Sequence, residues 1–136
     1  VHNRYILMPL AERDIYLTYL CNTVLAINRT MFIFTQMVCE TRRVSSLLGL
    51  LGIGAVSLHA GLSPSARTAA LNEFRAGVSP VIVTTDTAAR LGPLPRADYV
   101  VHFQLTWRMN AETYMQRIRN VACTDKAGHA ITFVSQ

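Results

Sequence analysis

Apolar runs that are typical of buried strands alternate along the chain with segments whose apolar residues follow helical spacing. The runs lie at residues 3–8, 31–34, 55–58, 80–84, 99–103 and 129–134, and several are continuously apolar, as in strands covered on both faces. Between the first two runs, residues 11–24 show helical spacing, with one apolar face formed by Leu17, Leu20, Cys21 and Val24. The pattern predicts strands that alternate with helices.

Residues that favour helix ends mark three further helices. One helix is marked by apolar residues at helical spacing, Val44, Leu47, Leu48 and Leu51. It is expected to end at Gly52, because glycine favours helix ends. Ser63 and Pro64 are suited to cap and begin the next, which reaches Gly77. Asn110 is expected to cap a last helix that reaches about residue 121.

This alternation predicts right-handed βαβ crossovers and a parallel sheet with helices on both faces. The expected fold is a three-layer α/β domain over residues 1–136, whose central strands bury Ile33, Val56, Ile82, Val100 and Ile131. Ligands of such sheets bind outside the carboxyl ends of the strands. We therefore expect the chemistry in the loops that follow Phe34, Leu58, Thr84 and Phe103.

Composition restricts the partners without identifying them. The chain has 136 residues, 51% of them hydrophobic, which suits one globular domain, and its net charge of +5 favours an anionic partner such as nucleic acid. A basic surface without a partner explains the charge equally well. Cys21, Cys39 and Cys123 are an odd number without metal-ligand spacing, so we expect an intracellular, reducing location and neither disulfides nor a metal site.

Two further readings concern targeting and length. Residues 44–66 carry no charge and are long enough to cross a bilayer, but their glycines and their change of period favour a helix, a turn and a strand, so no membrane partner is expected. The chain begins at Val1, which we interpret as the start of one piece of a longer protein.

Familiar nucleotide-binding loops are absent from the sequence. It contains neither Gly-x-x-x-x-Gly-Lys-Ser/Thr nor a Gly-x-Gly-x-x-Gly that follows a strand. Gly49, Gly52 and Gly54 follow a predicted helix and precede a strand, where glycine serves helix ends and turns. We expect that this chain binds no nucleotide alone.

Five short motifs occur in a characteristic order. They are FIFTQ (32–36), LHAGLSPSAR (58–67), LNEFRAG (71–77), TTDTAAR (84–90) and YMQRI (114–118). With the closing AITFV (130–134), their order resembles the second, C-terminal RecA-like lobe of DEAD-box ATP-dependent RNA helicases over essentially the whole chain. The resemblance implies RNA as a partner, an N-terminal helicase lobe in the same polypeptide, and ATP and Mg²⁺ bound mainly through that absent lobe.

Four residues are candidates for RNA contact. Arg67 is in the first turn of its predicted helix, where a phosphate is favoured, and Thr84, Thr85 and Arg90 follow a strand's carboxyl end. The resemblance assigns Arg67, Thr85 and Arg90 to RNA phosphates, contacts that read backbone and not sequence. Each residue also has an ordinary structural explanation. The residues that would support these motifs are Phe34, His59 and Asp86.

The stretch after the Thr-Asp motif departs from the family pattern Ala-Arg-Gly-Leu-Asp-Ile-Pro. Leu91 stands in place of its glycine and Pro93 in place of the aspartate that holds the nucleotide ribose in the family. Proline offers neither a side-chain acceptor nor a backbone N–H.

The family's last motif, His-Arg-Ile-Gly-Arg-x-x-Arg, is also degenerate. Asn120 and Cys123 replace the two arginines that face the γ-phosphate, and Arg119 stands where the family has glycine. Such arginines contribute roughly 10³–10⁵ in rate. Arg117 is retained, and Arg119 is the candidate substitute for the lost arginine at position 120. Because neighbouring helical residues point about 100° apart, we expect Arg119 not to reach that arginine's position without local unwinding of the helix.

The leading hypothesis is an RNA-binding lobe with little or no ATPase activity that works with ribonucleoprotein or ribosome assembly factors. One alternative is an active ATP-dependent RNA helicase in rRNA processing, which an upstream Gly-Lys-Thr loop and Asp-Glu-Ala-Asp motif would favour. Another is a protein-interaction scaffold without RNA contact. The closing residues 130–136 favour a nucleolar member, with cytoplasm or an organelle as the other compartments.

Overall fold

In the computed structural model, which describes residues 2–104, 110–119 and 128–135, strands and helices alternate as expected. The strands are β1 (His2–Met8), β2 (Met31–Thr35), β3 (Ala55–Leu58), β4 (Val81–Thr85), β5 (Tyr99–His102) and β6 (His129–Ser135). The helices are α1 (Arg13–Ala26), α2 (Val38–Leu50), α3 (Pro64–Arg75), α4 (Asp86–Ala89) and α5 (Ala111–Ile118), with one 3-10 turn at Leu10–Glu12.

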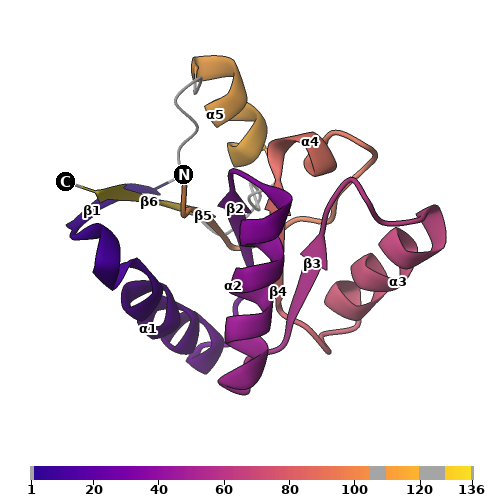
Figure 1. Cartoon of the computed structure of the whole chain (residues 1–136), viewed down its shortest axis with the longest axis horizontal. Helices are drawn as coiled ribbons and strands as arrows, with labels where there is room; N and C mark the ends of the chain where they lie inside the picture. The colour runs from indigo at the N-terminus through magenta and orange to yellow at the C-terminus, as the bar shows by residue number, and fades with distance from the viewer. Residues whose placement is uncertain (1, 105–109, 120–127, 136) are drawn as a thin grey trace.

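The strands form one sheet in the order β1-β6-β5-β2-β4-β3, and the pairings between these strands are all parallel. Because parallel strands point the same way, their carboxyl ends share one edge of the sheet. α4 and α5 gather at that edge (Figure 1). The predicted parallel sheet is confirmed.

Two apolar clusters cover the two faces of the sheet. On one face, Ile33 and Val83 pack with side chains of α1 and α2, including Leu17 and Leu48. On the other face, Phe32, Ile82 and Val100 pack with Leu71 and Phe74 of α3, which lies away from α1 in Figure 1. The sheet is therefore the middle of three layers, and the five residues predicted for its central strands, Ile33, Val56, Ile82, Val100 and Ile131, are all buried.

Helix caps explain most of the element boundaries. The Ser63 side chain accepts a hydrogen bond from the backbone N–H of Ala66, and Asn110 accepts one from that of Thr113, as the sequence predicted. α2 ends one residue early, because Leu51 is its C-cap and is 52% exposed, while Gly52 turns the chain at φ +79°. Leu51 follows the helical spacing in the sequence but lies just outside the helix.

The uncharged segment 44–66 folds as the end of α2, a turn, β3 and the start of α3. Within the described ranges, no helix combines the length and apolar character needed to cross a bilayer. The short helix α4 was not predicted. It begins directly after β4, where the Thr85 hydroxyl caps it by accepting a hydrogen bond from the N–H of Ala88.

Candidate nucleic-acid interface

A cavity of about 270 Å³ opens at the carboxyl edge of the sheet, where β2, α4 and α5 meet. Its apolar lining comes from Phe34, Ala89, Pro93 and Leu94. Its polar lining comes from Asp86, Arg90, Gln116, Arg117 and Arg119. The cavity thus combines the end of β2, α4 with the loop that follows it, and α5, which are three of the segments that carry the sequence motifs.

The inner end of the cavity is closed by an ion pair between Asp86 and Arg117. The Arg117 side chain, 1% exposed, donates from Nε and from one terminal nitrogen to the two Asp86 carboxylate oxygens at 2.6 and 2.7 Å. Its guanidinium carbon lies 4.9 Å from the centre of the Phe34 ring. A bidentate, buried pair of this kind fixes α5 against the ends of β2 and β4.

His102 continues this polar network behind Arg117. The two side chains are joined by a hydrogen bond of 3.1 Å to His102 Nδ1, which must accept, because guanidinium groups only donate. Burial and the adjacent Arg117 charge lower the pKa of His102 to about 3, so its ring is neutral. The ring stacks on Tyr114, whose hydroxyl donates to Asn3 of the edge strand at 2.6 Å.

Arg67 supports the loop that lines the cavity. Its guanidinium donates to the backbone carbonyls of Ala88 at 2.8 Å and Gly92 at 3.4 Å, and the side chain is half-buried. Arg67 therefore joins the start of α3 to the loop after α4. Its predicted phosphate contact stays a prediction, since its donors are directed at the protein's own backbone.

Thr84 and Thr85 are both buried at the end of β4. The Thr84 hydroxyl donates to the carbonyl of Thr85 at 3.2 Å, and the Thr85 hydroxyl is occupied as the cap of α4. His59, at the end of β3, is also buried, and its Nδ1 accepts the N–H of Gly61 at 3.1 Å. These three side chains shape the motif loops from inside.

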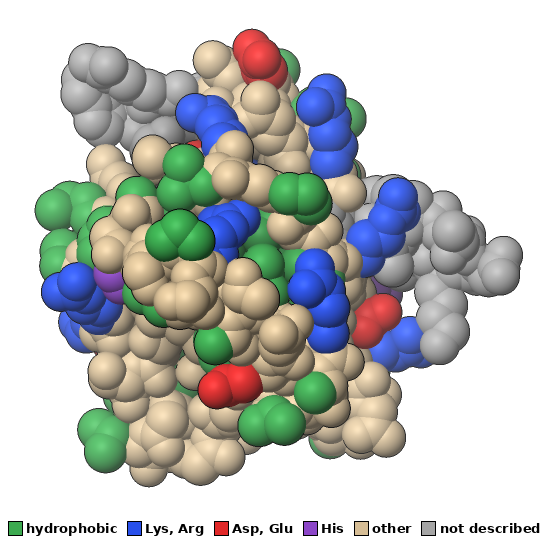
Figure 2. All heavy atoms as spheres, turned by 90° about the vertical axis from the view of Figure 1, so that its right-hand side faces the viewer, with side chains coloured by type: hydrophobic (Ala, Val, Ile, Leu, Met, Phe, Trp, Pro, Cys, Tyr) green, Lys and Arg blue, Asp and Glu red, His purple; other side chains and the backbone are tan. Residues whose placement is uncertain are grey.

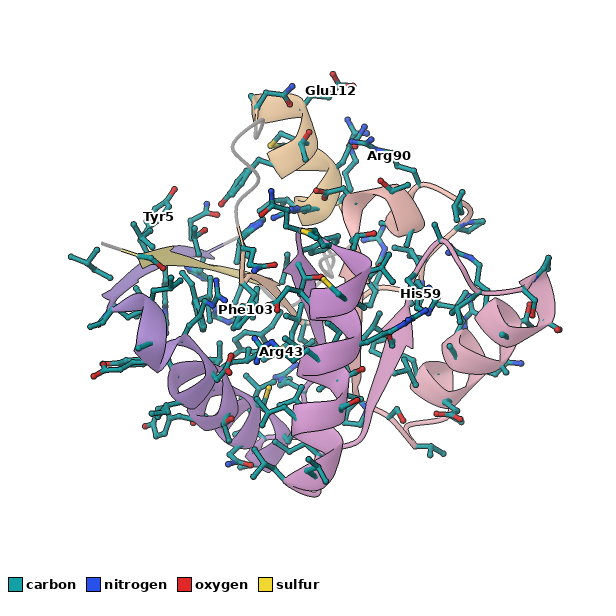
Figure 3. All side chains as sticks on the ribbon, in the orientation of Figure 1. Tyr5, Arg43, His59, Arg90, Phe103 and Glu112 are labelled. Carbon is teal, nitrogen blue, oxygen red and sulfur yellow. The ribbon has the colours of Figure 1, made fainter. Side chains whose placement is uncertain are left out.

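Arg90 is the exposed member of the four predicted RNA contacts. Its Nε donates to Gln116 Oε1 at 3.1 Å, which links the end of α4 to α5, and Figure 3 shows its side chain beside these helices. Arg119, at the C-cap of α5, is exposed and lines the same cavity. Figure 2, which faces the α3 side, shows more basic than acidic side chains on this face.

Of the positions that depart from the family pattern, Pro93 lines the cavity and Leu91 is 58% exposed beside it. Asn120 and Cys123 lie outside the described residues. Within the described part, no group of three or more His, Cys, Asp or Glu side chains is placed to hold a metal ion. Cys21 is buried, and desolvation raises the pKa of its thiol to about 12.

Sequence reasoning missed the roles of Gln104, Gln116 and His102. Gln104 Oε1 accepts the N–H of Gln36 at 2.8 Å, and its amide donates to Glu40 at 3.3 Å, which ties the loop after β5 to the start of α2. Gln116 lies within the motif at 114–118 but was given no role, and no motif includes His102 or Gln104. For Gln104, its position just past a predicted strand end was the one available signal.

Comparison with protein families gives one match over most of the chain. The model of the helicase conserved C-terminal domain matches residues 16–123. The chain is 44% identical over 134 residues to ATP-dependent rRNA helicase rrp-3 of Neurospora crassa, a match that covers 98% of this chain and 25% of that protein. The rrp3 protein of Sclerotinia sclerotiorum is 43% identical, with 97% and 27% covered. The chain thus spans about a quarter of these relatives.

Solved structures share the fold. The Escherichia coli DEAD-box protein SrmB, bound to regulator of ribonuclease activity A, superposes with a TM-score of 0.89 at 23% identity over 99% of this chain and 78% of that one. The C-terminal domain of the DEAD-box protein Dbp5 gives 0.86 at 25% identity over 100% and 77%. The parallel sheet with helices on both faces is therefore the RecA-like arrangement.

Proposed function

Because this chain belongs to the helicase conserved C-terminal domain family, as the C-terminal lobe of a DEAD-box RNA helicase, we propose that it binds RNA with little or no ATPase activity. The observation that carries the proposal is the lining of the cavity. Its exposed cations, Arg90 and Arg119, are available to an anion, while Pro93 occupies the place of the family's ribose-binding aspartate.

The cavity does not fit the nucleotide that the family binds. Asp86 is the sole carboxylate in its described lining, and both of its oxygens accept hydrogen bonds from Arg117. The one described carboxylate of this lining is therefore paired with Arg117 and is not available to ribose hydroxyls. Pro93 adds no acceptor through its side chain. We therefore assign this cavity no part in ATP hydrolysis.

RNA binding rests on charge at the carboxyl edge. Arg90 presents an exposed guanidinium there, and the chain carries a net charge of +5. Phosphate contacts of this kind give affinity without sequence readout and weaken as salt rises. Arg67 and Thr85 also hold α4 and the loop after it, and direct contacts of Arg67, Thr84 and Thr85 with RNA remain predictions.

The relatives' names point to ribosomal RNA. Both fungal relatives are named ATP-dependent rRNA helicases, so we propose rRNA in a ribosomal precursor as the substrate, ribonucleoprotein assembly factors as partners and the nucleolus as the compartment. The same names favour the second candidate, an active rRNA helicase. An ATPase measurement on the full-length protein separates the two.

A protein-interaction scaffold is the remaining candidate, favoured by apolar side chains that are exposed on β1 and α1. The most exposed of them are Tyr5, Leu7, Ile15 and Tyr19, each at least 60% exposed. A scaffold without RNA contact would bind single-stranded RNA weakly and without dependence on salt.

Fluorescence anisotropy with a labelled single-stranded RNA tests the RNA role. We expect the full-length protein to bind with an affinity that falls as salt rises, and Arg90→Ala to weaken binding on the order of tenfold at low salt. Exposed Arg75, the last residue of α3, provides the matched control, and Arg75→Ala should bind as the parent does. If Arg90→Ala and the parent bind equally across the salt titration, RNA binding at this edge is wrong.

A further inference from the structure

Arg90 and Arg119 are two cations at one cavity without a carboxylate to balance them. Both are exposed and both line the cavity. Among the described residues, neither guanidinium takes part in a salt bridge. The third arginine of the lining, Arg117, is neutralised by Asp86. The outer part of the cavity therefore holds two positive charges that no described carboxylate pairs with.

The geometry of α5 explains how these arginines come to the same place. Gln116 and Arg119 are three residues apart, so they lie on the same side of the helix. Gln116 accepts the hydrogen bond from Arg90 Nε at 3.1 Å, which holds Arg90 against that side. The helix ends at Ile118, and Arg119 is its C-cap. Arg119 thus reaches the cavity from a helix end.

We propose that Arg90 and Arg119 together bind one phosphate group at the mouth of this cavity, a role that rests on the proposed RNA binding and locates it. Planar guanidinium groups match the geometry of phosphate oxygens and remain charged at all physiological pH values. The apolar walls, Phe34, Ala89, Pro93 and Leu94, exclude water on one side and so strengthen the attraction.

Two sequence differences in the lining act in the same direction. Pro93 stands where the family pattern has an aspartate, and Arg119 where it has a glycine. The first removes a negative charge from the lining and the second adds a positive one. Together they make this cavity a stronger site for an anion, although a weaker one for a ribose. Because the lining lacks the family's ribose-binding aspartate, we assign this phosphate to the RNA backbone, and a free nucleotide is the alternative source that the test distinguishes.

The test measures RNA affinity against salt for the full-length protein and for Arg119→Ala, Arg90→Ala and the double variant. For single-stranded nucleic acid, each phosphate contact contributes about 0.7 to the slope of log affinity against log salt. If both arginines are needed to neutralise one phosphate, each single variant reduces the slope by about 0.7 and the double variant reduces it by no more than that. Arg75→Ala should keep the parent slope. The start of α3 contacts the cavity loop through Arg67, whereas Arg75 is the last residue of this 12-residue helix, which is ~18 Å long.

Competition with ATP and with inorganic phosphate at matched ionic strength identifies the source of the phosphate. If the site takes a free nucleotide, ATP displaces RNA from the parent but much less from Arg119→Ala. If the site binds the RNA backbone, ATP competes no better than inorganic phosphate. The evidence for the site then comes from the changed salt slopes of the variants. Either result supports the site.

The inference is wrong if Arg119→Ala keeps both the salt slope of the parent and its response to ATP. If only Arg90→Ala loses RNA affinity, the inference fails but the proposed RNA binding still holds. If the parent protein does not bind RNA at low salt, the proposed function itself is wrong. Thermal unfolding verifies that each variant is folded, which is expected because both side chains are exposed.

Discussion

The inner and outer ends of the cavity hold arginines in opposite situations. At the inner end, Arg117 is 1% exposed and is matched to a carboxylate, a ring and a neutral histidine. At the outer end, Arg90 and Arg119 are exposed and form no salt bridge with any described residue. The inner arginine maintains the fold, whereas the outer pair is available to a ligand.

The same contrast separates what this lobe keeps from what it has changed. The retained motif residues Phe34, Asp86 and Arg117 hold the strand ends and α5 together. The altered residues, Leu91, Pro93 and Arg119, are exposed on the side that a ligand would meet. Loss of the retained residues would lower the stability of the folded lobe, whereas changes at the altered positions affect only which ligand is bound.

The largest expected effect comes from breaking the inner pair. Asp86→Ala leaves the buried Arg117 charge unpaired, which should lower the free energy of unfolding by about 3–5 kcal/mol. Urea unfolding measures it. Asp14→Ala is the control, because Asp14 pairs with the exposed Arg43 at 2.7 Å, and loss of a surface pair costs about 0.2–1 kcal/mol. Equal losses for Asp86→Ala and Asp14→Ala would contradict the structural role of the inner pair.

A smaller loss is expected when Arg67 is replaced. Its hydrogen bonds to the carbonyls of Ala88 and Gly92 connect α3 to the cavity loop, and a hydrogen bond from a charged group is worth about 1.5–3 kcal/mol. Arg67→Ala should therefore destabilise the protein by that amount in urea unfolding. Arg67→Lys should restore little, because one ammonium cannot reproduce the planar fork. Full stability in Arg67→Ala would leave Arg67 free for a phosphate, as the sequence alone suggested.

Lowering the pH tests the neutral histidine of the inner network. Because the folded-state pKa of His102 is about 3 and its ordinary value is 6.5, the unfolded state takes up a proton first. The His102 contribution to stability is full above pH 6.5 and is lost as the pH falls toward 3. Between pH 6.5 and 5 the loss amounts to about 1.5 kcal/mol.

The measurement is urea unfolding of the parent and of His102→Gln at several pH values. The groups around His102 are Arg117, Asp86 and Tyr114. The other histidines are common to both proteins, so the difference between the two curves isolates His102. Parallel curves from pH 6.5 to pH 5 would show that this ring is not held neutral.

The fold was predictable because its signals are local. The continuous run at residues 31–34 could be buried on both faces only as a central strand, and Ser63 with Pro64 marks a helix start. α4 escaped because four residues show no periodicity, and its cap, Thr85, was interpreted as a ligand contact. Leu51 follows the helical spacing but is exposed, because the chain turns away at Gly52.

The site was predictable in location but less so in detail. The strand-end rule placed Asp86, Arg90 and Phe34 at one edge, and all three line the cavity. Asp86 and Arg117 are 31 residues apart in sequence, so their pairing depends on tertiary packing that no local pattern encodes. The partners of Arg67 are backbone carbonyls, which carry no residue-specific signal.

Steady-state phosphate release by the full-length protein, with and without RNA at saturating ATP and magnesium, tests the central claim most directly. We predict no RNA-dependent turnover, because Pro93, Asn120 and Cys123 replace the family's ribose and phosphate ligands. The combined variant Leu91→Gly, Pro93→Asp, Asn120→Arg and Cys123→Arg should regain some activity, and single reversions little, since such groups act as a unit. RNA-dependent turnover by the unmodified protein on the order of 1–10³ per second would contradict the account and establish an active helicase.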